Sequence, residues 1–455
     1  MSVLDKWIEH ILCAKYEQID DNAIRWAKIR ILDVIGCIAA GVQAPGNPEI
    51  VELVESYGGT EQATIFFYKK RAPLIWAAMV NSITARSLDY GPVDPEFEEA
   101  SFPGHLSETT IPTALNVGEF LKSSGREVLI GLIVAEDLAC RLIAASRYNP
   151  QMCGWNNISI ANAFAVTALY GRLSGLEPRE LRNAFGILLD LLSGTFQNTQ
   201  DRCTAFKLCQ GVAAKNGIFA VELARRGWTG SKDPLFSRYG YFKMFTQVVW
   251  EEPLLKDLGQ KYYTDRTIKP YPACRLTHAG IDCALLIRAE QNIEVDQIEE
   301  VVLYISPNET ALSIAEPFQP GDFPEADVIF NYRYPIATAL VEGTFKPIHH
   351  QMKFVNNPLI RKVANTIRIE PSDCVKSFLA AGLKVKFKNR QEILKTVEVP
   401  KGDRRRNPLT EDEIKQKFVE NLQYSNKTKI GEEILEHVEN LEKLENISDL
   451  TKLLQ

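Results

Sequence analysis

The chain has 455 residues, of which 45% are hydrophobic and 24% charged, and its formal net charge is −6. A chain of this length can form two or three domains with well-buried cores, and its composition is that of an ordinary globular protein. The acidic excess argues against a broad nucleic-acid surface, which needs a basic domain, although a pocket can still carry a local positive charge.

The N-terminal segment MSVLDKWIEHILCAKYEQIDD has acids on both sides of its short apolar patches, so it lacks the basic start of a signal peptide. No apolar run reaches the roughly 18 residues of a membrane span. Nine scattered cysteines form no CxxC pair, which argues against a zinc site or a redox couple. We therefore expect a cytoplasmic protein with reduced thiols and with neither nucleic-acid nor membrane partners.

The first 250 or so residues read as helices. Residues 20–42 combine an Asp cap, apolar positions at helical spacing and Gly41 as a stop. The segment 126–146 is apolar almost all round, which is typical of a helix buried between others. Segments 160–175 and 210–227 are Ala-rich and close with Gly. Small residues allow close packing, so we expect a compact all-helical domain.

The pattern changes near residue 265. Residues 298–306 contain β-branched side chains and alternate between apolar and polar residues with a period of two, as a strand does. Residues 383–399 read as two strands joined by a polar turn at 388–390. Between them, residues 334–345 and 357–369 look helical. After Pro400 the pattern becomes helical again, and Thr410 and Glu413 form a capping box. The last thirty residues read as a surface helix or two.

These changes predict a fold that is mostly α with an α+β insertion. The large all-helical domain would comprise residues 1–265 and 400–455, and a smaller α+β lid domain would comprise residues 266–399.

Familiar catalytic motifs are absent: there is no Walker A sequence, GxGxxG after a strand, HExxH or GxSxG. The adjacent pair His349-His350 has no nearby acid or thiol, so we predict no metal site there. The run Arg404-Arg405-Arg406 precedes a helix and reads as a solvated loop.

Two of the six histidines lie in unusual local sequence. His105 sits in a Pro/Gly-bounded loop before a helix expected to start near residue 109 or 110, where the helix dipole lowers an imidazole pKa; a surface or hinge histidine is the alternative. His278 follows the rigid loop KPYPACRLT, with Lys269, Tyr271 and Arg275 close in sequence. That loop either presents a base beside a carboxylate clamp or is only a polar turn.

Asp89 ends an apparent helix before a Pro-rich acidic loop, where it either orients a base or caps a turn. Lys207 lies near the start of an Ala-rich helix, a position where the dipole disfavours a cation. That local conflict hints at a functional lysine.

Six collinear segments together resemble the MmgE/PrpD superfamily: ILDVIGCIAAG, VNSITARSLDY, HLSETTIPTALNVGE, KPYPACRLTHAGID, FNYRYPIATALVEGTF and PKGDRRRNPLTEDEIKQKF. Its members include 2-methylcitrate dehydratase, cis-aconitate decarboxylase and iminodisuccinate epimerase. The resemblance implies a helical domain built from both chain ends with an inserted α+β lid. It also implies a homodimer, no metal or organic cofactor, and a small carboxylate substrate bound between the domains.

The resemblance also implies site residues. Asp89 matches the first acid of the family's Leu-Asp-Tyr/Phe-Asp-Asp-Thr motif, but Gly91, Pro92 and Val93 stand where the later acids and the threonine belong. His105 matches the histidine before a Pro-containing helix. A further family histidine falls on Asn156 or Asn157.

The Leu-His-x-Gly motif becomes Leu208-Cys209-Gln210-Gly211, and Lys207 matches the upstream lysine within a residue. Lys269, His278 and Tyr334 match well. The resemblance therefore implies as catalytic residues His105, His278, Lys207, Lys269, Tyr334 and Asp89. It implies Asn156 and Asn157 as substrate-binding residues, and the local sequence of the loop adds Arg275 and Tyr271 to them.

The shared reaction of such enzymes breaks a bond beside a carboxylate and needs a positioned base and cations at the developing charge. We therefore predict a cofactor-independent lyase, a decarboxylase or a dehydratase, acting on a small di- or tricarboxylate such as cis-aconitate. Because several family acids and histidines are missing, an epimerase of the iminodisuccinate type is the alternative, and a non-catalytic relative is a third.

Overall fold

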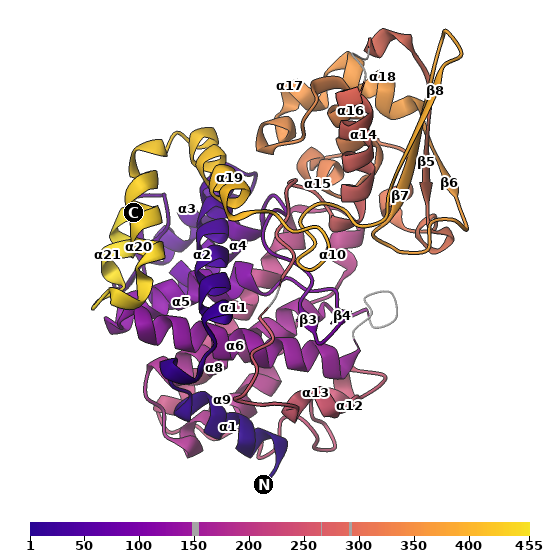
Figure 1. Ribbon diagram of the computed structural model, residues 1–455. Helices are drawn as coiled ribbons and strands as arrows, with labels where there is room; N and C mark the ends of the chain where they lie inside the picture. Colours follow the sequence, from indigo (N-terminus) through magenta and orange to yellow (C-terminus); the bar gives the residue numbers. More distant parts are fainter. Residues whose placement is uncertain (148–153, 265, 291–293) are drawn as a thin grey trace.

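A computed structural model of the chain describes residues 1–147, 154–264, 266–290 and 294–455. It has a large helical part and a smaller α+β part at one end (Figure 1). The predicted fold class, mostly helical with an α+β insertion, is confirmed. Residue 265, at which the first predicted segment ends, lies outside the described residues.

The helical part contains helices from both ends of the chain. Before the insertion they are α1 Val3–Cys13, α2 Asp21–Gly41, α3 Asn47–Tyr57, α4 Leu74–Arg86, α5 Ser107–Leu121, α6 Gly125–Ser146, α8 Asn157–Leu173, α9 Pro178–Leu191, α10 Gln197–Gln200, α11 Leu208–Arg225, α12 Tyr241–Phe245 and α13 Glu252–Leu255. After it they are α19 Glu411–Tyr424, α20 Gly431–Glu439 and α21 Ser448–Leu453.

Helix α2 shows why these segments fold as they do. Asp20 caps it by accepting a hydrogen bond from the Ala23 N–H at 2.8 Å. Its last residue is Gly41, as predicted, and a Cβ there would lie 2.3 Å from the Thr84 carbonyl oxygen of α4. Glycine therefore both ends the helix and lets α2 and α4 approach closely.

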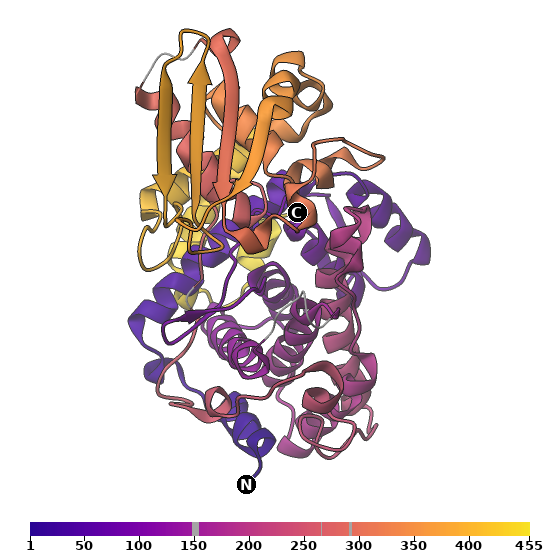
Figure 2. The ribbon, with the colours of Figure 1, turned by 90° about the vertical axis from the view of Figure 1, so that its right-hand side faces the viewer.

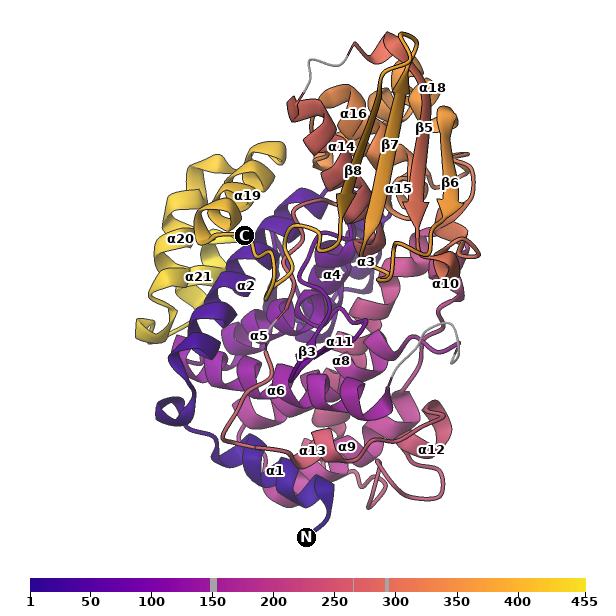
Figure 3. The same ribbon diagram turned by 45° about the vertical axis from the view of Figure 1, so that its right-hand side comes forward.

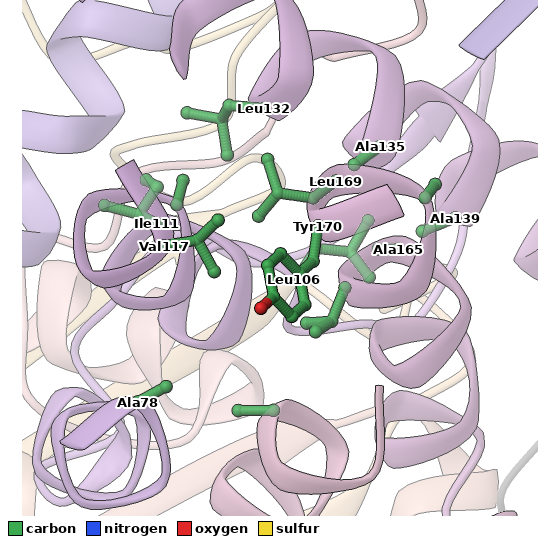
Figure 4. Close-up of a cluster of buried hydrophobic side chains, with 14 of the residues drawn as sticks. Ala78, Leu106, Ile111, Val117, Leu132, Ala135, Ala139, Ala165, Leu169 and Tyr170 are labelled. Atoms are coloured by element: carbon green, nitrogen blue, oxygen red, sulfur yellow. The ribbon is translucent and has the colours of Figure 1, made fainter. Parts of the chain in front are cut away.

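One apolar core runs through the helical part. Figure 4 shows a section in which side chains of α4, α5, α6 and α8 meet, including Ala78, Ile111, Leu132 and Leu169. The same core includes Leu450 and other apolar side chains of α20 and α21, while charged side chains such as Glu432 and Glu433 are exposed. The last thirty residues therefore form surface helices with one buried face, as predicted. Helix α19 packs along α2, as the adjoining yellow and indigo helices of Figure 1 show.

Two short hairpins interrupt this helical part, which is therefore not purely helical. Strand β1 (Ala63–Ile65) pairs with β2 (Lys70–Ala72), and β3 (Glu96–Phe97) pairs with β4 (Ala100–Ser101), both antiparallel. Strands of two or three residues are too short for an alternating pattern to reveal them.

The α+β part is a four-stranded sheet with helices on one face (Figures 2 and 3). Its strand order is β6-β5-β7-β8, with β5–β6 parallel and the other pairs antiparallel. The strands are β5 Ile298–Ile305, β6 Ile367–Pro371, β7 Ala381–Phe387 and β8 Glu392–Val397. The helices are α14 His278–Glu290, α15 Pro324–Ile329, α16 Arg333–Glu342, α17 Met352–Val355 and α18 Pro358–Thr366.

The α+β part has its own apolar core, formed by buried side chains from residues 273–387, whereas the main helical core takes side chains from residues 4–262 and 418–454. Ile268, in the predicted lid segment, packs instead with Trp26, Leu409 and Ile414, and the division at residues 265/266 and 399/400 remains a prediction. Within the predicted helical segment 357–369, the structure instead turns from α18 into strand β6 at Ile367. That strand was missed because its few residues continue the apolar pattern of the helix.

Candidate active site

A buried ionic cluster lies where the α4–α5 connection of the helical part meets residues 266–278, the segment leading to α14. Its centre is Asp89, three residues beyond α4, whose φ of 48° is stabilised by a backbone bond from its N–H to the Arg86 carbonyl. Asp89 Oδ1 accepts from the Arg86 guanidinium and, at 2.9 Å, from Lys269 Nζ. Burial alone would raise the pKa of Asp89, but Arg86 and Lys269 outweigh it and hold that pKa at about 2.

Lys269 fastens the two parts of the molecule together. Besides Asp89 Oδ1, its ammonium group donates to the Asp89 carbonyl at 2.8 Å and to the Ala273 carbonyl at 3.1 Å. An ammonium has three N–H donors, and each has an acceptor here. Lys269 is fully buried, and the hydrogen bonds of its ammonium group within the described part of the chain go to Asp89 and the Ala273 carbonyl.

His105 is held against the same aspartate. Its Nε2 lies 3.5 Å from Asp89 Oδ1, and its Nδ1 lies 2.8 Å from Glu108 Oε1. Burial, followed by the charge of Arg86, keeps the pKa of His105 well below its usual value, so the ring is neutral at physiological pH. Helix α5 begins at Ser107 rather than near residue 109. A neutral imidazole is the form that a general base requires.

Glu108 and Arg86 belong to this site, but the sequence reasoning did not single them out. Glu108 is fully buried, its pKa is raised to about 7 by burial, and its Oε2 has no hydrogen-bond partner in the described part of the chain. Arg86 is 5% exposed, and its Nε likewise lacks a partner among the described residues. The available signal was a charged residue within a segment of otherwise apolar and small side chains.

A cavity of about 380 Å³ adjoins this cluster. The Phe206 ring and Cys209 form part of its wall, together with Trp155, Ser159, Leu208 and Val212. The centroid of the Phe206 ring lies 5.4 Å from the Arg86 guanidinium carbon, so this wall residue also contacts the buried cation. Asn156 caps α8 nearby through a hydrogen bond from the Ile158 N–H to its side chain.

His278 begins α14 but does not present a free nitrogen. Its Nε2 lies 3.2 Å from the Ala273 carbonyl oxygen, and its Nδ1 lies 3.4 Å from Arg275 Nη1. Burial keeps the pKa of His278 well below its usual value, and the positive charges of Arg275 and Lys269 lower it further. The neutral ring therefore braces the loop that carries Lys269 and Arg275.

Lys207 precedes α11 and faces the α+β part. Its ammonium donates to the Pro45 carbonyl at 2.6 Å, and its nitrogen lies 5.9 Å from the centroid of the Phe323 ring. Burial lowers the pKa of Lys207, and the charge of Glu325 in α15 opposes that shift. Glu325 is buried and its own pKa is raised by burial, which places a second acid–amine pair between the two parts.

The other predicted site residues have structural partners. The Tyr334 hydroxyl donates to the His349 carbonyl at 2.6 Å inside the α+β core, and the Tyr271 hydroxyl donates to Asp282 at 2.6 Å. Asn157 accepts from the Tyr241 hydroxyl at 2.8 Å. The structure therefore brings Asp89, His105 and Lys269 together, but it does not direct the Tyr334 or Tyr271 hydroxyl at them.

Arg275 is 5% exposed, and its Nη1 donates to the Lys401 carbonyl at 3.1 Å. Its Nη2 has no hydrogen-bond partner within the described ranges. Burial raises the pKa of the neighbouring Asp94 to about 6, with Arg275 opposing the shift. Arg275 therefore has an N–H group available to bind an anion, whereas all three N–H groups of Lys269 already have acceptors.

Among the residues that the structure describes, no three His, Cys, Asp or Glu side chains are grouped so that they could hold a metal ion. In the same described ranges, no helix combines the length and apolar character needed to cross a membrane. The cytoplasmic location remains a prediction.

Comparison with known proteins gives matches over most of the chain. The family model described as the MmgE/PrpD N-terminal domain matches residues 6–251, and the model described as the MmgE/PrpD C-terminal domain matches residues 271–443. Cis-aconitate decarboxylase of Homo sapiens is 24% identical over 473 residues, which cover 100% of this chain and 95% of that protein. Cis-aconitate decarboxylase of Aspergillus terreus is 25% identical over 468 residues, which cover 96% and 93%.

Proposed function

The chain belongs to the MmgE/PrpD family, and we propose that it is a lyase acting beside a carboxylate of a small di- or tricarboxylate such as cis-aconitate. The observation that carries this proposal is the neutral His105 imidazole, fixed between Asp89 and Glu108 at the junction of the two parts. The full-length similarity to cis-aconitate decarboxylases supports the same reaction class.

In a decarboxylation, the bond from carbon to the departing carboxylate breaks and its electron pair stays on carbon, which then takes a proton. Cations must stabilise that developing charge, and an acid must deliver the proton. Arg86 and Arg275 have N–H donors without partners among the described residues. We therefore assign these two side chains to binding the carboxylates of the substrate. The neutral His105 ring gives its Nε2 proton to that carbon while its Nδ1 takes the proton of the Glu108 carboxyl group, whose pKa burial raises to about 7. Lys269 holds Asp89 ionised beside the ring. No metal or organic cofactor enters this proposal.

The decisive experiment is proton NMR of the purified protein with cis-aconitate in D2O. The expected result is release of CO2 and an unsaturated dicarboxylate with deuterium on the protonated carbon. A folded His105→Ala variant should lose at least about 100-fold in kcat, since a positioned acid or base contributes at least that much. Turnover by this variant at the wild-type rate would remove His105 from the mechanism.

An epimerase is the second candidate, favoured by Gly91, Pro92 and Val93 at the positions of the family's further acids and threonine. Proton exchange at one carbon needs fewer acids than loss of hydroxide or CO2. In the same NMR experiment with amino-dicarboxylates, an epimerase would introduce deuterium at the α-carbon without forming an alkene. Silence across cis-aconitate, citrate, 2-methylcitrate and amino-dicarboxylates would favour a substrate outside this panel first, and a non-catalytic relative second.

Assembly as a homodimer remains a proposal. Large apolar side chains are exposed between residues 228 and 248, including Trp228 at 60% and Tyr239 at 65%. Exposed aromatic side chains are enriched at protein interfaces. Light scattering of the purified chain should give twice its mass of 51.2 kDa, and a monomeric mass at micromolar concentration would contradict the proposal.

A further inference from the structure

The space beside Gly91 is already filled by another residue's carboxyl group. A Cβ built at residue 91 would lie 2.6 Å from Glu108 Cγ, 2.7 Å from its Cδ and 2.8 Å from its Oε1. Real Cβ atoms do not approach heavy atoms so closely, so any side chain at 91 requires Glu108 to move. Gly91 is not among the glycines with positive φ, and its backbone would therefore accept an ordinary residue if the space were free.

The Glu108 carboxyl group cannot move away cheaply. It is fully buried on the first turn of α5, and its Oε1 lies 2.8 Å from His105 Nδ1. The charges that act on it come from three elements besides its own: Arg86 and Asp89 around the end of α4, Lys269 in the segment before α14, and Asp33 on α2. Its contact with His105 leaves Nε2 as the ring nitrogen that faces Asp89.

We propose that Glu108 is the positioning residue that orients His105, and that it supplies from α5 the carboxyl group that a side chain at residue 91 would otherwise supply. Gly91 is required because the two residues compete for one space. This inference rests on the proposed function for its catalytic consequence, but the shared space and the orientation of the ring are properties of the folded protein alone.

A double-mutant cycle on the full-length protein tests the shared space. Gly91→Ala should destabilise the wild-type protein but have little effect in a Glu108→Ala background, because truncation vacates the space. Gly104→Ala in both backgrounds is a matched control, since its Cβ would meet Pro95 rather than Glu108. Equal effects of Gly91→Ala in both backgrounds would overturn the proposal.

The orienting role is tested by moving the carboxyl group. Glu108→Ala should lower kcat at least tenfold with a smaller change in KM, and Gly91→Asp in that background should recover most of the loss. Gly91→Asn in the same background should not recover it, because it adds volume without an acid. The pH profile of kcat should lose the limb due to Glu108 in Glu108→Ala and regain an acidic limb in the Gly91→Asp, Glu108→Ala protein.

The ring of His105 gives a readout that does not depend on turnover. With the protein labelled at its imidazole nitrogens, Glu108→Ala should shift the Nδ1 resonance of His105, and Gly91→Asp in that background should return it toward the wild-type position. If the wild-type protein turns over no substrate but these shifts occur, the proposed function fails and the orienting role stands. If the wild-type protein is active but Glu108→Ala changes neither kcat nor the Nδ1 resonance of His105, the orienting role of Glu108 is wrong and the proposed function is retained.

Discussion

Replacing Glu108 by Gln should change how stability depends on pH. The folded-state pKa of Glu108 is raised by burial from 4.5 to about 7, against the opposing charges of Arg86 and Lys269. Because the folded-state value is the higher one, its stabilising contribution is complete below pH 4.5 and is lost as pH rises through about 7. At about 1.4 kcal/mol for each tenfold change in proton affinity, the loss is on the order of 3 kcal/mol.

Glutamine resembles the protonated acid at every pH, so the Glu108→Gln variant escapes this loss. Its free energy of unfolding relative to the wild type should therefore rise by about 3 kcal/mol between pH 4.5 and pH 8. Urea unfolding at half-unit pH steps, with both proteins measured side by side, cancels the groups that they share. Glu17→Gln, at an exposed side chain, controls for the substitution itself. A stability difference that stays constant across this range would refute the assignment of a protonated acid.

Three further predictions concern Arg86 in the candidate site, Gly125 at a close helix contact and the buried ion pair of Lys417. Arg86→Gln should weaken binding of tricarballylate, measured by calorimetry, about tenfold or more, because a charge-assisted donor is lost; unchanged affinity would exclude Arg86 as the carboxylate-binding residue. Gly125→Ala should destabilise the protein by about 2 kcal/mol or more in thermal unfolding, since its Cβ would lie 1.8 Å from the Leu441 carbonyl oxygen. Lys417→Met should cost about 3–5 kcal/mol by leaving the buried Asp33, now 2.7 Å from the Lys417 ammonium, without its partner; adding Asp33→Asn should restore much of the loss, and additive costs would contradict this.

The sequence predicted best those elements that carry both a period and a cap. Helices α2 and α19 have Asp20 and Thr410 at their N-caps, and their positions were confirmed. Strand β6 and the two short hairpins escaped prediction because long-range pairing, rather than local pattern, sets them. Strand β6 follows α18 directly and is placed by its parallel register against β5.

The candidate site divides in the same way. Family resemblance supplied Asp89, His105 and Lys269, which the structure brings together. Glu108 and Arg86 lie on buried helices, and in sequence each is a single charge among apolar and small side chains, a pattern that does not show what the charge contacts. Only the fold shows that both face Asp89 and His105. His278 is predicted as a residue that moves the proton, and in the structure its ring nitrogens lie near the Ala273 carbonyl and Arg275, neighbours that no local pattern could show.

The return of α19–α21 to the N-terminal helices has a consequence for synthesis on the ribosome. The α+β core is drawn from one continuous stretch of chain, so it can close as soon as that stretch emerges. The helical core needs Phe418, Ile434 and Leu450, which are synthesised after the α+β part, against partners synthesised before it. The apolar surface of the nascent N-terminal helices therefore stays uncovered until residues 418–454 have been synthesised. Removing α20 and α21 should therefore give an aggregation-prone chain that depends on chaperones, rather than a shorter native protein.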